Sequence, residues 1–117
     1  MTPETIEALK ASAEHWRENA KAERPEAINI RSSGCALCKL FIYAGCYGCP
    51  LVDVRDNCPK PGSTWRSAMQ CHVYWDDDPT DTTRRDNFRT AATAMADKLE
   101  SLLPTEITTK RNENEHQ

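Results

Sequence analysis

Two stretches of the chain place apolar residues at every third or fourth position, which is typical of helices that bury one face. The first begins at Thr2, a good N-cap residue, followed by Pro3. Its apolar positions are Ile6, Leu9, Ala13, Trp16 and Ala20. Pro25 ends the pattern, so we predict a helix that runs to about Glu23. The apolar stripe is narrow, and either a small core or a partner would cover it.

The second stretch predicts a helix over 83–103, capped by Asp81 or Thr82 and ended by Pro104. Its apolar positions are Phe88, Ala91 or Ala92, Met95, Leu99 and Leu102. Because the two stripes match in width, we expect these helices to pack antiparallel or to form the seam of a homodimer.

Between them, a shorter helix is predicted from Trp65 to Trp75, with Ser63 or Thr64 as its cap. Its buried face is expected to hold Trp65, Ala68, Met69, His72 and Val73. Residues 27–31 and 51–54 are expected to be extended. The predicted fold class is therefore mainly α, with two long amphipathic helices flanking a small, irregular zinc-knuckle segment rich in cysteine.

Composition indicates one small domain over 1–104 and a disordered polar tail over 105–117. Only 38% of the 117 residues are apolar, and the mean hydropathy is −0.73. The core is therefore small, and a bound metal ion would add much to the stability of the fold. No signal peptide and no membrane span are recognised. We therefore expect a cytoplasmic chain, in which disulfides rarely persist.

Charge is distributed unevenly along the chain. Residues 35–75 carry a net charge of +2 and residues 76–117 a net charge of −4. The acidic C-terminal part argues against nucleic-acid binding, although Lys39, Arg55, Lys60 and Arg66 lie near the cysteines.

Five of the six cysteines lie between Cys35 and Cys58. They form two C-x2-C pairs separated by seven residues, and a fifth cysteine follows eight residues after Pro50. Zn²⁺ takes four thiolates in a tetrahedron, and two such pairs supply them. The candidate ligands are Cys35, Cys38, Cys46, Cys49 and Cys58. Which four of the five bind stays open.

Other chemistry is compatible with the same cysteines. An iron–sulfur cluster also takes four thiolates, but the compact cysteine run of ferredoxins is absent. A disulfide framework fits the even cysteine count, and a thioredoxin-like dithiol lacks the required alternation of strands and helices. We expect Cys71 to be a small buried side chain, and His72 to be at most a hydrogen-bond partner of a thiolate.

Two charged segments have a plain and a functional interpretation. The acids Asp76, Asp77 and Asp78 lack the spacing of a calcium loop, which favours a solvated linker. The basic group of Arg84, Arg85 and Arg89 is expected to be a solvated helix face, with a phosphate or an acidic partner as the alternative.

The cysteine motif resembles a group of small cysteine-rich accessory proteins of phages and prophages. The likeness rests on Cys35-Ala-Leu-Cys38-Lys-Leu-Phe, on Cys46-x-Gly48-Cys49-Pro50, on Cys58 and on the ending Leu99-Glu-Ser-Leu-Leu-Pro104. It covers roughly residues 14–104. The resemblance implies a phage context without a known activity. It also implies that Cys58 takes part in the site and that Cys71 and His72 are not primary ligands.

No catalytic constellation is recognised in the sequence. We therefore predict a non-catalytic, zinc-binding module whose partner is a host or phage protein. The alternatives are a redox-active or iron–sulfur protein and a zinc module that binds nucleic acid.

Overall fold

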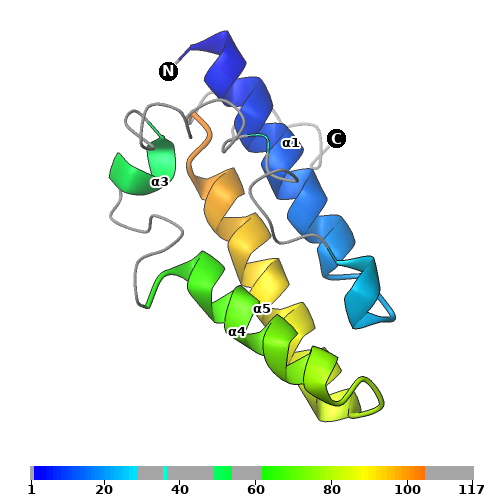
Figure 1. Cartoon of the computed structure of the whole chain (residues 1–117). Helices are drawn as coiled ribbons and strands as arrows, with labels where there is room; N and C mark the ends of the chain where they lie inside the picture. Colours follow the sequence, from blue (N-terminus) through cyan, green and yellow to red (C-terminus); the bar gives the residue numbers. More distant parts are fainter. Residues whose placement is uncertain (1, 29–35, 37–48, 54–61, 105–117) are drawn as a thin grey trace, which may run out of the picture.

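The computed structural model describes residues 2–28, 36, 49–53 and 62–104, and these form a mainly helical structure (Figure 1). The elements are α1 (Pro3–Asn19), the 3-10 turn η1 (Pro25–Ala27), the single turn α3 (Pro50–Asp53), α4 (Thr64–Asp77) and α5 (Thr82–Ser101). The predicted helical class is confirmed. Most of the expected knuckle segment, and the expected tail over 105–117, lie outside the described residues.

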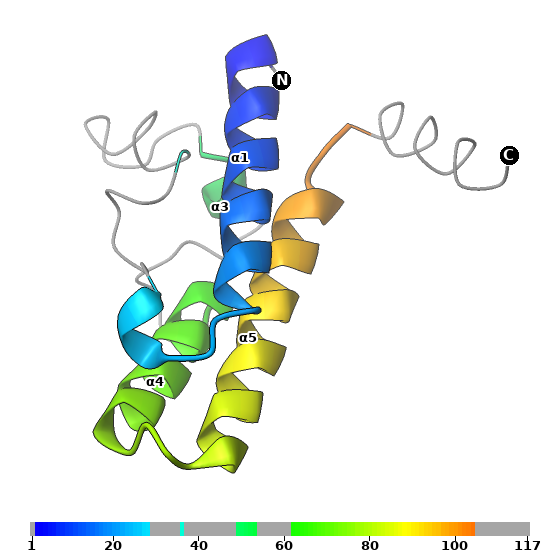
Figure 2. The ribbon, with the colours of Figure 1, turned by 90° about the vertical axis from the view of Figure 1, so that its right-hand side faces the viewer.

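Helix α5 is the central element, because it packs against both α1 and α4. Figures 1 and 2 show α1 and α4 running in one direction and α5 returning antiparallel to both. The two long helices thus pack against each other within one chain, which is one of the two arrangements that the sequence left open. The turn α3 lies beyond the start of α4, beside the C-terminal half of α5 (Figure 1).

Side-chain caps start the three long helices at the predicted places. The Thr2 hydroxyl accepts a hydrogen bond from the Thr5 N–H at 3.1 Å, and the Ser63 hydroxyl accepts one from the Arg66 N–H at 3.1 Å. The Asp81 carboxylate accepts two N–H groups, at 2.9 and 3.2 Å. Each cap satisfies donors that a helix start otherwise leaves unpaired, a contribution of about 1 kcal/mol.

The core is one apolar cluster to which all three long helices contribute. Its buried members are Ala8, Leu9, Ala13 and Trp16 of α1, Ala68 and Trp75 of α4, Phe88, Ala92, Met95, Ala96 and Leu99 of α5, and Cys49 and Leu51. Of the alanines left open by the sequence, Ala92 is fully buried and Ala91 is half-buried. Each large side chain in such a cluster contributes about 1.5–3 kcal/mol through burial.

The buried face of α4 differs from the predicted one. Val73 was expected inside but is 54% exposed, and its neighbour Tyr74 is 64% exposed. Trp75 is instead fully buried, with its ring 5.8 Å from that of Phe88. Residues i and i+2 of an α-helix are separated by about 200° around the helix axis. When Trp75 faces α5, Val73 must therefore face solvent, so the prediction for Val73 is wrong.

One boundary and two local conformations also differ from expectation. Helix α1 ends at Asn19 rather than near Glu23, because the chain tightens there, with Lys21 N–H bonded to the Glu18 carbonyl at 3.0 Å. Residues 51–53 are helical rather than extended, because Pro50 starts a helical turn. Ala27 closes η1, and the remainder of the expected extended segment after Ile28 lies outside the described residues.

Polar contacts fasten the helices to one another around the core. Arg17 of α1 reaches Asp97 at 2.7 Å and Glu100 at 3.0 Å, both on α5. Arg89 of α5 donates from Nη2 and Nε to the Ala22 carbonyl, at 3.0 and 3.3 Å. The C-terminal end of α1 and the turn that follows it are thereby held against α5.

Candidate metal centre

Cys49 is the one candidate metal ligand that lies within the described residues. Cys35, Cys38, Cys46 and Cys58 lie outside them. Within the described part of the chain, no three histidine, cysteine, aspartate or glutamate side chains form a group that could hold a metal ion. The zinc site therefore stays a prediction, and the structure bears on it through Cys49 and through the residues next to the other cysteines.

Cys49 lies at the border of the core. Its side chain is 7% exposed, Leu51 is 1% exposed, and both belong to the central apolar cluster. Pro50, between them, is buried as well and starts α3. The second C-x2-C pair is thus fixed to the helical scaffold at its last residue, by burial and not by a solvated linker.

Ala36 is the described residue of the first pair, because it lies between Cys35 and Cys38 in the sequence. Ala36 is half-buried and packs against the same apolar cluster as Cys49. One residue within each cysteine pair therefore contacts the same core. Two pairs of cysteine thiols are the donor set that Zn²⁺ prefers.

His72 is fixed by contacts within the scaffold. Its Nε2 lies 3.0 Å from the Pro25 carbonyl oxygen. Because a carbonyl can only accept, Nε2 carries the proton and donates it, which holds η1 against α4. The imidazole edge also packs on the Phe88 ring, with centroids 5.9 Å apart. A hydrogen bond from His72 to a thiolate would therefore have to come from Nδ1, which carries a proton only in the imidazolium form, and that role stays a prediction.

Cys71 belongs to a different environment, between α4 and α5. It lines a small cavity of about 230 Å³ together with Tyr74, Arg84 and Asn87. The side chain is half-buried rather than fully buried as expected, and burial raises the pKa of its thiol. A thiol that resists ionisation is a poor nucleophile and a poor metal ligand at neutral pH.

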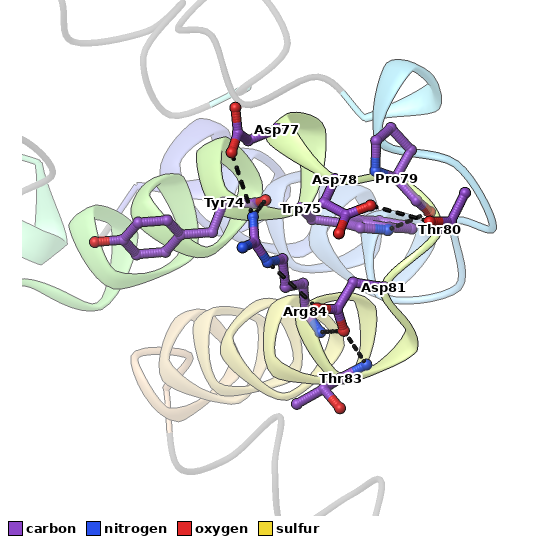
Figure 3. Close-up of polar contacts among 9 residues, drawn as sticks. All are labelled: Tyr74, Trp75, Asp77, Asp78, Pro79, Thr80, Asp81, Thr83 and Arg84. Atoms are coloured by element: carbon purple, nitrogen blue, oxygen red, sulfur yellow. Dashed lines mark hydrogen bonds and ion pairs between the residues drawn. The ribbon is translucent and has the colours of Figure 1, made fainter.

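The acidic residues at the end of α4 and in the turn before α5 are occupied by structural contacts (Figure 3). Asp78 accepts the Thr80 hydroxyl at 3.0 Å, Asp81 caps α5, and Asp77 lies 3.5 Å from Arg84. The Trp75 indole N–H donates to the Pro79 carbonyl at 3.3 Å. Asp76 and Asp77 are exposed to solvent, as predicted, but they lie in the last turn of α4 and not in a linker. The described carboxylates do not converge on one point.

The predicted basic patch is likewise engaged with the chain's own acceptors. Arg84 donates to the Tyr74 carbonyl at 2.8 Å and pairs with Asp77 and Asp81 (Figure 3). Arg85 pairs with Asp86 at 3.2 Å, and Arg89 is bound to Ala22 as described above. Arg84 and Arg89 therefore fasten α5 to its neighbours, whereas Arg85 is paired within α5, which favours the structural interpretation over a phosphate site.

Comparisons with known proteins found no match: no protein-family model, no curated protein and no solved structure is significantly similar to the chain. Among the described residues, none of the helices has the length and apolar character needed to cross a membrane. The resemblance to phage accessory proteins accordingly stays a prediction.

Proposed function

We propose that the chain is a zinc-stapled, non-catalytic binding module that engages a host or phage protein in the cytoplasm. Zinc would be held by four of the candidate thiols Cys35, Cys38, Cys46, Cys49 and Cys58. The observation that carries the proposal is the packing of Ala36 and Cys49, one residue from each cysteine pair, against one apolar cluster.

A second observation supports binding to a protein. Val73 and Tyr74 are adjacent on α4 and expose more than half of their side chains. Exposed aromatic side chains are enriched at protein interfaces, where they bury a large area at low entropic cost. The arginines near this face already have partners within the chain, which favours a protein partner over nucleic acid.

Elemental analysis together with an absorption spectrum tests the metal. Protein purified without oxygen is expected to contain one zinc per chain and to be colourless, whereas iron with visible absorption would replace the proposal by the iron–sulfur alternative. Cys49→Ser is expected to lower the zinc content, and Cys71→Ser is the matched control because Cys71 lies in a different environment. Equal zinc loss in both variants would contradict the proposed ligand assignment.

The partner is tested with Tyr74→Ser, which removes the exposed ring and should leave the core intact. A host or phage protein retained by the wild-type chain and lost with Tyr74→Ser would be purified, and its affinity measured at low and high salt. Little dependence on salt is expected for an apolar contact. Retention of nucleic acid with a steep salt dependence would refute the protein-binding version.

A further inference from the structure

The one-turn helix α3 carries a buried leucine directly after the candidate ligand Cys49. Leu51 is 1% exposed and belongs to the central cluster, although α3 has only four residues. A single helical turn is not stable by its own hydrogen bonds. Its position must therefore come from tertiary packing, and both Pro50 and Leu51 are buried.

We propose that Leu51 is a positioning residue for Cys49, so that the packing of the core sets the geometry of the metal site. The inference rests on the proposed zinc site and adds a residue that is not itself a ligand. Only Pro50 separates the two side chains, and its ring fixes φ near −65°. Because Pro50 restrains one of the few torsions between the two side chains, a displacement of Leu51 is transmitted in part to the Cys49 sulfur.

The connection between Leu51 and Cys49 matters because zinc tolerates little variation in the positions of its ligands. Zinc–sulfur distances vary by only about 0.2 Å around their preferred value. A leucine-sized hole under α3 would allow the turn to shift, because the structure around a cavity relaxes partially into it. Coupling is reciprocal, so bound metal in turn holds Leu51 in the core.

The test uses Leu51→Ala, Leu51→Met and a control variant, Phe88→Leu. Phe88 is fully buried in the same cluster, but it packs on His72 and Trp75, at the opposite end of α5 from α3 (Figure 1). Circular dichroism establishes that each variant is folded at the temperature used. Leu51→Val, which removes a single methylene, replaces Leu51→Ala if the latter unfolds.

Two properties are measured on each folded variant: zinc affinity, by competition with a chromophoric chelator, and the absorption spectrum after substitution with Co²⁺. We expect Leu51→Ala to weaken zinc binding about 10- to 100-fold, the range known for residues that support metal ligands. Its cobalt bands should shift in position and intensity. Leu51→Met, with nearly the same volume, should restore both properties, and Phe88→Leu should leave both unchanged.

Wild-type affinity and spectrum in Leu51→Ala would overturn the role of Leu51. An equal loss in Phe88→Leu would overturn it too, since general destabilisation would then explain the effect. A wild-type protein that binds neither zinc nor cobalt would refute the zinc site itself. The three results are distinct, so failure of the positioning role and failure of the proposed function can be told apart.

Discussion

The bridge from Arg17 to two carboxylates of α5 allows a quantitative prediction about how α1 is held in place. Arg17 lies 2.7 Å from Asp97 and 3.0 Å from Glu100. Hydrogen bonds raise the pKa of its guanidinium, the bond to Glu100 more than the bond to Asp97. The Glu100 side chain is 26% exposed and that of Asp97 is 63% exposed. Because water screens the more exposed pair better, the Glu100 pair should contribute more to stability.

Exposed ion pairs contribute about 0.2–1 kcal/mol in double-mutant cycles. We expect a coupling energy of about 0.5–1 kcal/mol for Arg17 with Glu100, and about 0.2–0.5 kcal/mol for Arg17 with Asp97. The variants are Arg17→Met, which keeps most of the apolar stem, Glu100→Gln and Asp97→Asn. The free energy of unfolding is obtained from urea titrations followed by tryptophan fluorescence, with zinc at one fixed concentration.

The cycle between Lys10 and Glu7 on α1 is the matched control. These groups are 3.7 Å apart, with side chains 48% and 76% exposed, so their coupling should be close to zero. In 1 M salt, where the screening length falls to about 3 Å, the Arg17 couplings should shrink by more than half. The reasoning would be refuted if the Asp97 coupling equalled or exceeded that of Glu100, or if salt left both unchanged.

Two further predictions concern close packing and an ionisable thiol. Ala92→Leu should destabilise the protein by about 1–3 kcal/mol, because Ala92 is fully buried where added atoms must displace neighbours, whereas Ala94→Leu on the exposed face should change stability by less than about 0.5 kcal/mol in urea titrations. Burial raises the pKa of Cys71, so its alkylation, followed by mass spectrometry, should accelerate at a higher pH in the folded protein than in urea. The unfolded thiol then releases its proton first, so stability should fall as the pH rises above about 9, the ordinary value for that thiol, and Cys71→Ala should reduce this fall. An alkylation profile identical in both states would contradict the raised pKa.

Local signals account for most of what the sequence predicted about the fold. Thr2, Ser63 and Asp81 start helices because their side chains bond nearby N–H groups, an effect that depends on a few adjacent residues. The apolar spacing on α5 likewise identified the face of Phe88 and Leu99, both fully buried. Such features are encoded within one or two helical turns, so tertiary contacts did not need to be known.

The face of α4 could not be predicted in the same way. An apolar run that includes Val73, Tyr74 and Trp75 fits more than one helix orientation, and only the position of α5 determines that Trp75 is buried. The bond from His72 to Pro25 has a similar origin, because the two residues lie 47 positions apart. Neither the contact nor its partner leaves a periodic signal in the sequence.

The packing of Cys49 and Leu51 also has an electrostatic consequence for the proposed metal site. Cys49 borders an apolar cluster, and ionising a thiol there without a cation costs desolvation energy. Zn²⁺ binds only the thiolate, so each thiol that becomes a ligand must lose its proton. Four thiolates and one Zn²⁺ together add a charge of −2 to a segment whose side chains sum to +2. Metal binding would then release protons and bring the segment near neutrality, so zinc affinity should rise with pH until the thiols ionise unaided.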